Sequence, residues 1–341
     1  MQNTPILFVR VDLGACDPTT LTSRGVTKVT TTSEQPEIVY LLDASIYIFQ
    51  SHFSPYVECR STEGTELSAF YGFTLFLLQF LRRVKPTHLA IAHDASLFCG
   101  FRHELSPDYK SNRELPDENL AMQLQACSEI CGILGLISFV SKVYEADDII
   151  GTMASNVRQE SDACAIHIVS RDKDLAQLLV SKQDCLWDYS GNSKRFSTDI
   201  MNDYGVWPEQ FTDYLGLVGD SVDCISGVPG VGPVKARALL EAFGSVEGIY
   251  RNLDKVGALS LRGAARLPDI LAANRESAEL SKLLATIVCD VSDDNEAFSN
   301  ITLETLLRGR PDLRGLESFL AQYCFSGRDL DHILSQARQL G

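Results

Sequence analysis

Short apolar runs that end in an acid recur along the chain and limit its fold class. The run IVYLLD ends at Asp43, and the run THLAIAHD ends at Asp94. A third run, CAIHIVSRDKDLAQLL, has a strand pattern through Val169 and then carries Asp172 and Asp174. Continuously apolar runs of this length are typical of strands buried on both faces of a parallel sheet. The chain is therefore expected to fold around such a sheet.

Helical patterns alternate with these strands. The stretch LSAFYGFTLFLLQFLRRV, residues 67–84, is amphipathic, and Pro86 ends it. Helical periodicity returns over residues 118–134, and a further helix is expected to begin near Ala146. The alternation predicts an α/β fold with a mostly parallel central sheet flanked by helices. Because ligands bind at the carboxyl ends of parallel strands, the strand-end acids are expected to share one site.

The stretch EADDIIG adds a second acidic feature, at the start of a helix. It places Glu145, Asp147 and Asp148 within four residues. A helix N-terminus offsets only about 0.3 to 1 kcal/mol for each acid, so the crowding requires another positive charge. Oxygen ligands of this kind suit Mg²⁺ or Mn²⁺. Each acid alone is explained as a helix cap or a solvated side chain, but the whole set favours a metal site.

The overall composition bears on partners and location. The formal net charge of -15 argues against a nucleic-acid partner, but the objection weakens if the clustered acids hold metal ions. The ten cysteines include no CxxC pair, which favours reduced thiols. No apolar run reaches the roughly 18 residues that cross a bilayer, and the start lacks a signal-peptide pattern. A cytoplasmic protein with no membrane partner is therefore expected.

The second half of the chain, from about residue 208, is helical in pattern. The stretch GDSVDC contains Asp220 and Asp223, and GVPGVGPVKARALL follows it. Glycines let backbone amides approach a phosphate closely, and the next helix N-terminus adds its dipole. Gly230, Gly232 and Lys235 therefore predict a helix-hairpin-helix at about 222–243 that binds a nucleic-acid backbone. A turn that uses glycine for geometry alone is the alternative.

A basic segment, FRHELSPDYKSNRELP, occupies residues 101–116 of this otherwise acidic protein. It contains Arg102, Tyr109, Lys110 and Arg113. Such a segment would clamp phosphates electrostatically while Tyr109 stacks on a base. A solvated loop of mixed charge is the simpler alternative.

These motifs, taken in order, resemble the 5′ nuclease family, the flap-endonuclease-like enzymes that include the 5′→3′ exonuclease domain of bacterial DNA polymerase I. The resemblance runs from about residue 38 to at least residue 253 and rests on LLDAS, AHDAS, FRHELSPDYKSNR, YEADD, SRDKDLAQLL and GDSVDCISGVPGVGPVKA. It implies a PIN-like nuclease core at 37–207 with a helical arch at about 99–117. A helical DNA-binding lobe would occupy 208–341. Residues 1–36, rich in Thr and Ser, are expected to be a poorly ordered leader.

The resemblance also implies a two-metal phosphodiesterase and its residues. Lys110, Arg113 and Asp148 would be catalytic, and Arg102, Tyr109, Gly230, Gly232 and Lys235 would join Lys110 and Arg113 in binding DNA. Two or more Mg²⁺ or Mn²⁺ ions would be held by Asp43, Asp94, Glu145, Asp147, Asp148, Asp172, Asp174, Asp220 and Asp223. A K⁺ ion would bind at the hairpin.

The implied activity is that of a standalone, monomeric nuclease. It would hydrolyse DNA at 5′ flaps, ends, nicks or gaps during replication or repair, and would remove RNA primers from RNA–DNA hybrids. Four residues depart from the family pattern: Ala44, His93, Arg171 and Cys224. None of them removes a ligand, although Arg171 and Cys224 would alter metal affinity.

Three other interpretations compete with this one. A PIN-type ribonuclease shares the acidic strand ends but normally lacks the hairpin. A catalytically weak module that binds DNA structures would be expected to lack some of the acids. A metal-dependent phosphatase leaves the basic segment and the hairpin without a role.

Overall fold

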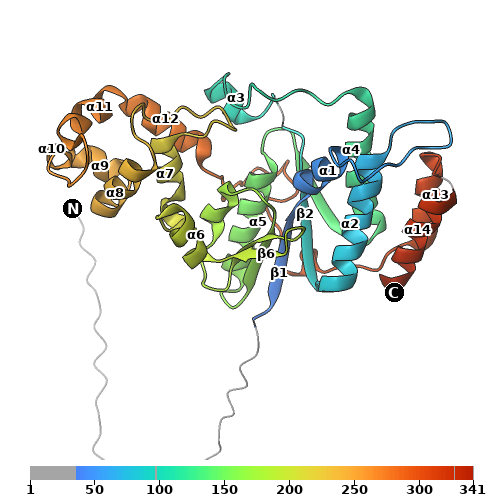
Figure 1. Cartoon of the computed structure of the whole chain (residues 1–341). Coiled ribbons are helices and arrows are strands. Elements are labelled where there is room, and N and C mark those ends of the chain that lie inside the picture. Colours follow the sequence, from blue (N-terminus) through green and yellow to red (C-terminus); the bar gives the residue numbers. More distant parts are fainter. Residues whose placement is uncertain (1–35, 97, 326, 341) are drawn as a thin grey trace, which may run out of the picture. The chain divides into compact units, whose positions relative to one another are not determined.

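A six-stranded sheet forms the centre of the computed structural model, which describes residues 36–96, 98–325 and 327–340 (Figure 1). The leader expected at 1–36 lies outside the described residues except for Pro36. The strand order is β3-β2-β1-β4-β5-β6, parallel except for the antiparallel β6. The strands are β1 (Ile38–Asp43), β2 (His88–Asp94), β3 (Ile137–Ser141), β4 (Ala165–Val169), β5 (Cys185–Asp188) and β6 (Ser193–Arg195). The predicted α/β architecture is therefore present.

The side chains of β1 alternate between two apolar clusters, one on each face of the sheet. Val39 and Leu41 pack in the first cluster, and Tyr40 and Leu42 pack in the second. Helix α5 (Ala146–Glu160) covers the first face, while α1 (Ala44–His52), α2 (Ser68–Val84) and α4 (Glu118–Ile133) cover the second. Burial on both faces explains why the strand sequences are continuously apolar.

The strand order places a switch point at the carboxyl ends of β1 and β4. The chain builds outward through β2 and β3 on one side of β1, and through β4 and β5 on the other. Leu42 pairs with Ile91 of β2 and with Val169 of β4. The residues that follow these three strands therefore emerge at the same edge, where open parallel sheets bind ligands.

Short helices make up most of the second half. They are α6 (Ser197–Tyr204), α7 (Phe211–Val218), α8 (Pro233–Phe243), α9 (Val246–Arg251), α10 (Leu253–Val256), α11 (Leu267–Ala273) and α12 (Arg275–Ala285). Single turns of 3-10 helix are η1 (Asp174–Leu178), η2 (Pro208–Gln210), η3 (Ala264–Arg266), η4 (Glu304–Leu306) and η5 (Arg338–Leu340). No helix among the described residues is long and apolar enough to cross a membrane.

The C-terminal end revises the expected lobe of residues 208–341. Helices α13 (Leu313–Gln322) and α14 (Gly327–Ala337) return to the sheet domain and lie beside α4 and α2 (Figure 1). Leu316, Leu320 and Ile333 join the cluster on that face. Both helices are amphipathic, and their apolar faces complete the core over α2 instead of extending the lobe.

The arch and the hairpin contain less helix than expected. In the arch, only α3 (Phe101–Leu105) is helical, and residues 107–112 form turns. In the hairpin, residues 219–232 are non-helical and connect α7 to α8. Lys110 and Cys224 have φ values of 50° and 57°. A left-handed residue interrupts a helix, which explains both differences from the sequence-based expectation.

Candidate active site at the carboxyl edge of the sheet

Asp43 ends β1 and starts the helix that follows. Its Oδ1 accepts a hydrogen bond from the Ser45 amide at 3.0 Å, which makes it the N-cap of α1. Its Oδ2 accepts a hydrogen bond from the Ser170 hydroxyl, just after β4, at 2.9 Å. Burial, with the nearby carboxylates of Asp172 and Asp94, raises the pKa of Asp43 to about 7. The switch point thus concentrates carboxylates that repel one another.

Asp172 and Asp174 follow β4 in a tight turn. The Asp174 amide donates to Asp172 Oδ1 at 2.9 Å, and Asp174 begins η1. Burial and the Asp172 carboxylate raise the pKa of Asp174 to about 7. Asp174 Oδ1 is buried and accepts no hydrogen bond from any described residue, although Lys173 Nζ lies 3.2 Å away. The Lys173 ammonium is therefore the positive group nearest to this oxygen that the structure shows.

Asp147 lies in the same group of acids. Burial, followed by the charges of Asp172 and Asp43, raises its pKa well above the ordinary value for an aspartate. Asp94 is partly buried, and its Oδ1 accepts hydrogen bonds from the amide and hydroxyl of Ser96 at 3.1 and 2.9 Å. The predicted convergence of Asp43, Asp94, Asp147 and Asp172 is thus reflected in their mutual charge repulsion.

Glu145 is the N-cap of α5, and Lys110 of the arch faces it. Lys110 Nζ lies 2.9 Å from both carboxylate oxygens of Glu145, and the Tyr109 hydroxyl donates to Oε2 at 3.0 Å. Burial alone would raise the pKa of Glu145, but Lys110 and Arg102 hold it below the ordinary value. Lys110 and Tyr109 are 6% and 3% exposed. In this arrangement neither side chain reaches a DNA surface as the sequence-based interpretation requires.

Asp148 and Arg102 form a buried pair instead of facing a metal or DNA. Arg102 donates from Nη1 and Nη2 to the two oxygens of Asp148 at 2.6 and 2.7 Å. Each oxygen accepts one more bond, from the Val288 amide at 2.9 Å or the Glu145 amide at 3.1 Å. The carboxylate is fully buried and the arginine is 3% exposed. In this arrangement their polar groups are engaged with each other, and the expected roles of Asp148 as a ligand and of Arg102 as a DNA contact stay predictions.

Asp220 and Asp223 lie in the connection between α7 and α8. The backbones of Asp220 and Ile225 exchange two hydrogen bonds of 2.8 and 2.7 Å, which closes a turn around Asp223. Arg113 donates to Asp223 Oδ1 at 2.8 Å, and the Lys110 amide donates to the Asp223 carbonyl at 3.0 Å. The base of the arch and this turn are therefore joined directly.

Lys173 is a further charged residue at the site that the sequence-based analysis did not single out. Its Nζ donates to Asp220 Oδ2 at 2.5 Å. The signal was present, because Lys173 stands between two of the candidate acids in the stretch SRDKD. Among the described residues, no three His, Cys, Asp or Glu side chains are grouped to hold one ion. Lys110 and Lys173, together with Arg102 and Arg113, supply the positive charge in this arrangement.

The four departures from the family pattern differ in their surroundings. Ala44 is buried at the start of α1. His93 points into the core beside Cys131, 3.7 Å from its Sγ, where burial lowers its pKa to about 4. Arg171 pairs with Asp188 at 3.5 Å on the neighbouring strand. Only Cys224, next to Asp223 and 3.8 Å from the Ser111 hydroxyl, contacts the base of the arch.

The hairpin has an exposed glycine loop in front of α8. Gly230 has a φ of 82°, Gly232 caps α8, and no heavy atom lies within 4 Å of a Cβ built on either residue. Lys235 folds back and donates to the Gly230 carbonyl at 2.7 Å. The loop and the N-terminus of α8 are thus open to an incoming group, as a backbone-binding hairpin requires.

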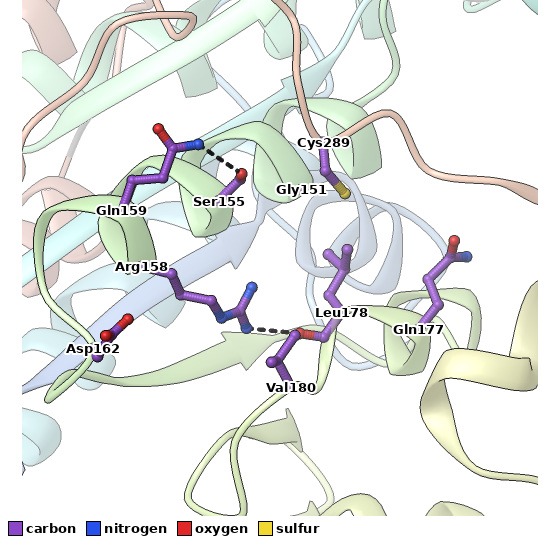
Figure 2. Close-up of a pocket in the computed structure, with 9 residues that line it drawn as sticks. All are labelled: Gly151, Ser155, Arg158, Gln159, Asp162, Gln177, Leu178, Val180 and Cys289. Atoms are coloured by element: carbon purple, nitrogen blue, oxygen red, sulfur yellow. Dashed lines mark hydrogen bonds between the residues drawn. The ribbon is translucent and has the colours of Figure 1, made fainter. Parts of the chain in front are cut away.

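Two cavities flank η1, one at its start and one at its end. The smaller one lies among the acids and is lined by Arg102, Tyr109, Glu145, Asp147, Asp174, Asp223, Ile225, Leu284, Ala285 and Ile287. The larger, of about 520 Å³, lies between α5, η1 and Cys289, and none of the candidate acids lines it (Figure 2). The acids and the arch define the smaller cavity as the candidate active site. Carboxylates at the switch point of a parallel sheet, faced by lysines, are a setting for hydrolysis of a phosphate ester.

Comparisons with known proteins identify the family. The family described as "5'-3' exonuclease, N-terminal resolvase-like domain" matches residues 38–205, and "5'-3' exonuclease, C-terminal SAM fold" matches residues 206–306. The chain therefore belongs to the 5′-3′ exonuclease family, and it is a hydrolytic nuclease that acts on DNA. The predicted family, fold class and enzyme class are confirmed.

Individual relatives agree with this assignment. A 5′-3′ exonuclease of Buchnera aphidicola is 32% identical over 256 residues, 75% of this chain and 88% of the relative. DNA polymerase I of Streptococcus pneumoniae is 34% identical over 296 residues, 84% of this chain but only 32% of the polymerase. A phage T5 flap endonuclease, solved with DNA and metal ions, matches with a TM-score of 0.56 at 18% identity, covering 89% of this chain and 98% of that one.

Removing the Lys110 ammonium group is expected to destabilise the metal-free protein. In Lys110→Met, the buried Glu145 carboxylate keeps only the Tyr109 hydroxyl and Arg102, the latter 3.6 Å away. A loss of about 1 to 3 kcal/mol in the free energy of unfolding should follow, measured by urea unfolding in EDTA. Lys142, which is exposed, provides the matched control, Lys142→Met. Equal stability of the two variants would show that the Lys110 pair is not needed to neutralise the acids.

Proposed function

We propose that the protein is a metal-dependent, structure-specific 5′ nuclease that cleaves DNA at 5′ flaps and 5′ ends. The observation that supports this most strongly is the unbalanced negative charge at the switch point. Asp43 and Asp174 are both held at pKa values near 7 by burial and neighbouring acids. Carboxylate groups so close together are stable only if they share cations or protons.

The residues fit divalent ions of the hard, oxygen-binding type. All the candidate ligands are carboxylates, and the buried Asp174 Oδ1 is offset by the Lys173 ammonium at 3.2 Å, without a hydrogen bond from a described residue. Mg²⁺ or Mn²⁺, two or more ions, suit such donors. The residues that would hold them are Asp43, Asp94, Glu145, Asp147, Asp172, Asp174, Asp220 and Asp223. Bound ions of this class activate water and stabilise a leaving oxygen.

The arch would supply the contacts to the scissile phosphate. Arg113 is 39% exposed at its side chain and lies next to the acids through Asp223. Lys110 is buried on Glu145 and would reach a phosphate only after that carboxylate takes another cation. Positive groups placed where the transition state gathers negative charge are each worth about 10²- to 10³-fold in rate. Lys110 would therefore become free to bind the substrate phosphate only when a metal ion neutralises the acidic site.

The hairpin would bind the duplex away from the cleavage site. Gly230, Gly232 and Lys235 surround the open N-terminus of α8, which suits a phosphate and, through the loop carbonyls, a K⁺ ion. Contacts of this kind follow backbone shape and carry no base specificity. RNA–DNA hybrids at 5′ primers would therefore be accepted as well as DNA. The protein would act as a monomer.

Cleavage of a 5′-labelled flap duplex tests the proposal. The substrate is compared with the same duplex bearing a 3′ flap, each in Mg²⁺, Mn²⁺ or EDTA. Release of the 5′ flap in either metal, none in EDTA, and little cleavage of the 3′ flap are expected. Equal cleavage of both flaps would contradict structure specificity. Tight flap binding without cleavage would favour the binding-module alternative.

A further inference from the structure

Residues 284–288, which span the end of α12 and the first residues after it, are held largely by side chains of the nuclease core. This stretch is called the return segment, because it leads the chain back from the short helices to α5. Arg102 donates to the carbonyls of Leu284 and Thr286 at 3.0 and 2.7 Å. Gln177 donates to the Ala285 carbonyl at 3.1 Å and accepts from the Ile287 amide at 2.9 Å. The Val288 amide donates to Asp148 Oδ1 at 2.9 Å, and the Val288 carbonyl accepts a longer bond of 3.4 Å from the Thr152 hydroxyl.

Gln177 is the member of this set that bonds directly to Asp174. It lies in η1, three residues after Asp174, and its Nε2 also donates to the Asp174 carbonyl at 2.9 Å. Both N–H groups and the carbonyl of one side-chain amide are therefore engaged. A 3-10 helix of five residues has poor internal hydrogen bonds, so contacts of this kind fix its orientation. The apolar partners of η1 fix only its buried side.

The hairpin region contacts α12, and α12 continues into the return segment that Gln177 binds. Gly216 of α7 packs against Lys282 of α12, where an added Cβ would lie 2.8 Å from the lysine Cβ. The Gly227 amide, in the hairpin connection, donates to the Ser281 hydroxyl at 3.0 Å. The return segment begins three residues after Ser281. A displacement of α12 would therefore move the backbone of the return segment, and with it the Gln177 side chain that is hydrogen-bonded to that backbone.

We propose that Gln177 is a positioning residue for the nuclease reaction: it sets the place of Asp174 relative to the return segment and hence to the hairpin that binds the substrate. This inference rests on the proposed function, in which Asp174 is a ligand of divalent ions. Groups that orient a ligand without touching the metal typically contribute about 10- to 100-fold to affinity or activity.

The substitution Gln177→Met, matched with Gln159→Met, tests this role. Both glutamines line the larger cavity, and Figure 2 shows them on different elements, Gln159 on α5 and Gln177 on η1. Gln159 is exposed, and its only hydrogen bond is a long one, 3.4 Å to Ser155. Methionine keeps the length of the side chain in both variants but removes its hydrogen bonds.

Three measurements distinguish a positioning role of Gln177 from a purely structural one. Relative to wild type and to Gln159→Met, Gln177→Met should lose about 10- to 100-fold in kcat on flap DNA with little change in KM. Part of this loss should be recovered at high Mg²⁺. The rise in Tm on adding Ca²⁺, without DNA, should also be smaller than in wild type. Gln177→Asn, which keeps the amide but is one methylene shorter, should give the same pattern and replaces Gln177→Met if the methionine variant does not fold.

Contrary outcomes are distinguishable. A Gln177 variant that has a lower Tm in EDTA but keeps kcat and the full Ca²⁺-induced rise would overturn the inference and leave the proposed function intact. A wild-type protein that shows neither metal-dependent cleavage nor a Ca²⁺-induced rise would overturn the proposed function, and the inference with it.

Discussion

Replacing Arg102 with methionine should lower the free energy of unfolding by about 3 to 5 kcal/mol, the usual result of removing one partner from a buried ion pair. The Asp148 carboxylate that remains is fully buried and would keep only the amides of Glu145 and Val288. Arg102→Met would also release the carbonyls of Leu284 and Thr286. Urea unfolding at pH 7 measures the loss. The exposed pair of Arg275 and Glu279, 2.8 Å apart, is the control, and Arg275→Met should cause no measurable change.

Asp148→Asn separates the two roles considered for Asp148. If this residue pairs with Arg102, the asparagine variant should lose stability much as Arg102→Met does, and the folded fraction should still cleave at low temperature. If it is instead a ligand, Asp148→Asn should abolish cleavage while leaving stability nearly unchanged. The double variant Arg102→Met/Asp148→Leu should recover part of the lost stability, because neither buried charge then lacks a partner.

The sequence predicted the acidic edge of the sheet because the apolar pattern of each buried strand, and the acid that ends it, are local properties. Continuous apolar runs indicate parallel strands, and parallel strands bring their carboxyl ends to one edge. The positions of Asp43 and Asp94 could therefore be predicted without knowing any distant contact. The same holds for Asp172 and Asp174, which follow the strand next to β1. Asp220 and Asp223 follow no strand of the sheet, so strand order alone does not place their turn at this edge.

The sequence could not assign residues whose roles depend on distant partners. Glu145 and Asp148 lie three residues apart on one helix turn, and nothing in this local pattern distinguishes their roles. Asp148 is buried in the core because it pairs with Arg102, which lies 46 residues earlier in the chain. The basic segment has a uniform charge pattern, but Tyr109 and Lys110 are buried on Glu145 while Arg113 remains partly exposed. Likewise, amphipathic patterns predict α13 and α14 but do not reveal that they dock on α2 and α4.

Asp147→Asn is expected to have opposite effects on activity and on stability. As a proposed ligand, Asp147 supports metal ions that are worth several kcal/mol to the transition state, and each 1.4 kcal/mol is tenfold in rate. A loss of about 10³-fold in cleavage should follow. In EDTA, however, the neutral amide removes a charge that repels Asp172 and Asp43. The variant should therefore unfold at a higher temperature than wild type, since active sites hold groups whose repulsion costs stability.

The dependence of this gain on pH follows from the direction of the pKa shift. Asp147 has a pKa well above the ordinary value in the folded protein, so its protonation stabilises the fold. That contribution is fully present below about pH 4, the unfolded value, and is lost as the pH rises toward the folded pKa. The difference in Tm between Asp147→Asn and wild type in EDTA should consequently be near zero at pH 4 and grow toward neutrality. Asp162→Asn, at an exposed position, should change neither cleavage nor Tm. If Asp147→Asn instead kept full cleavage and had a lower Tm at neutral pH, the carboxylate would be a structural group of α5, and the acidic site would have to work without it.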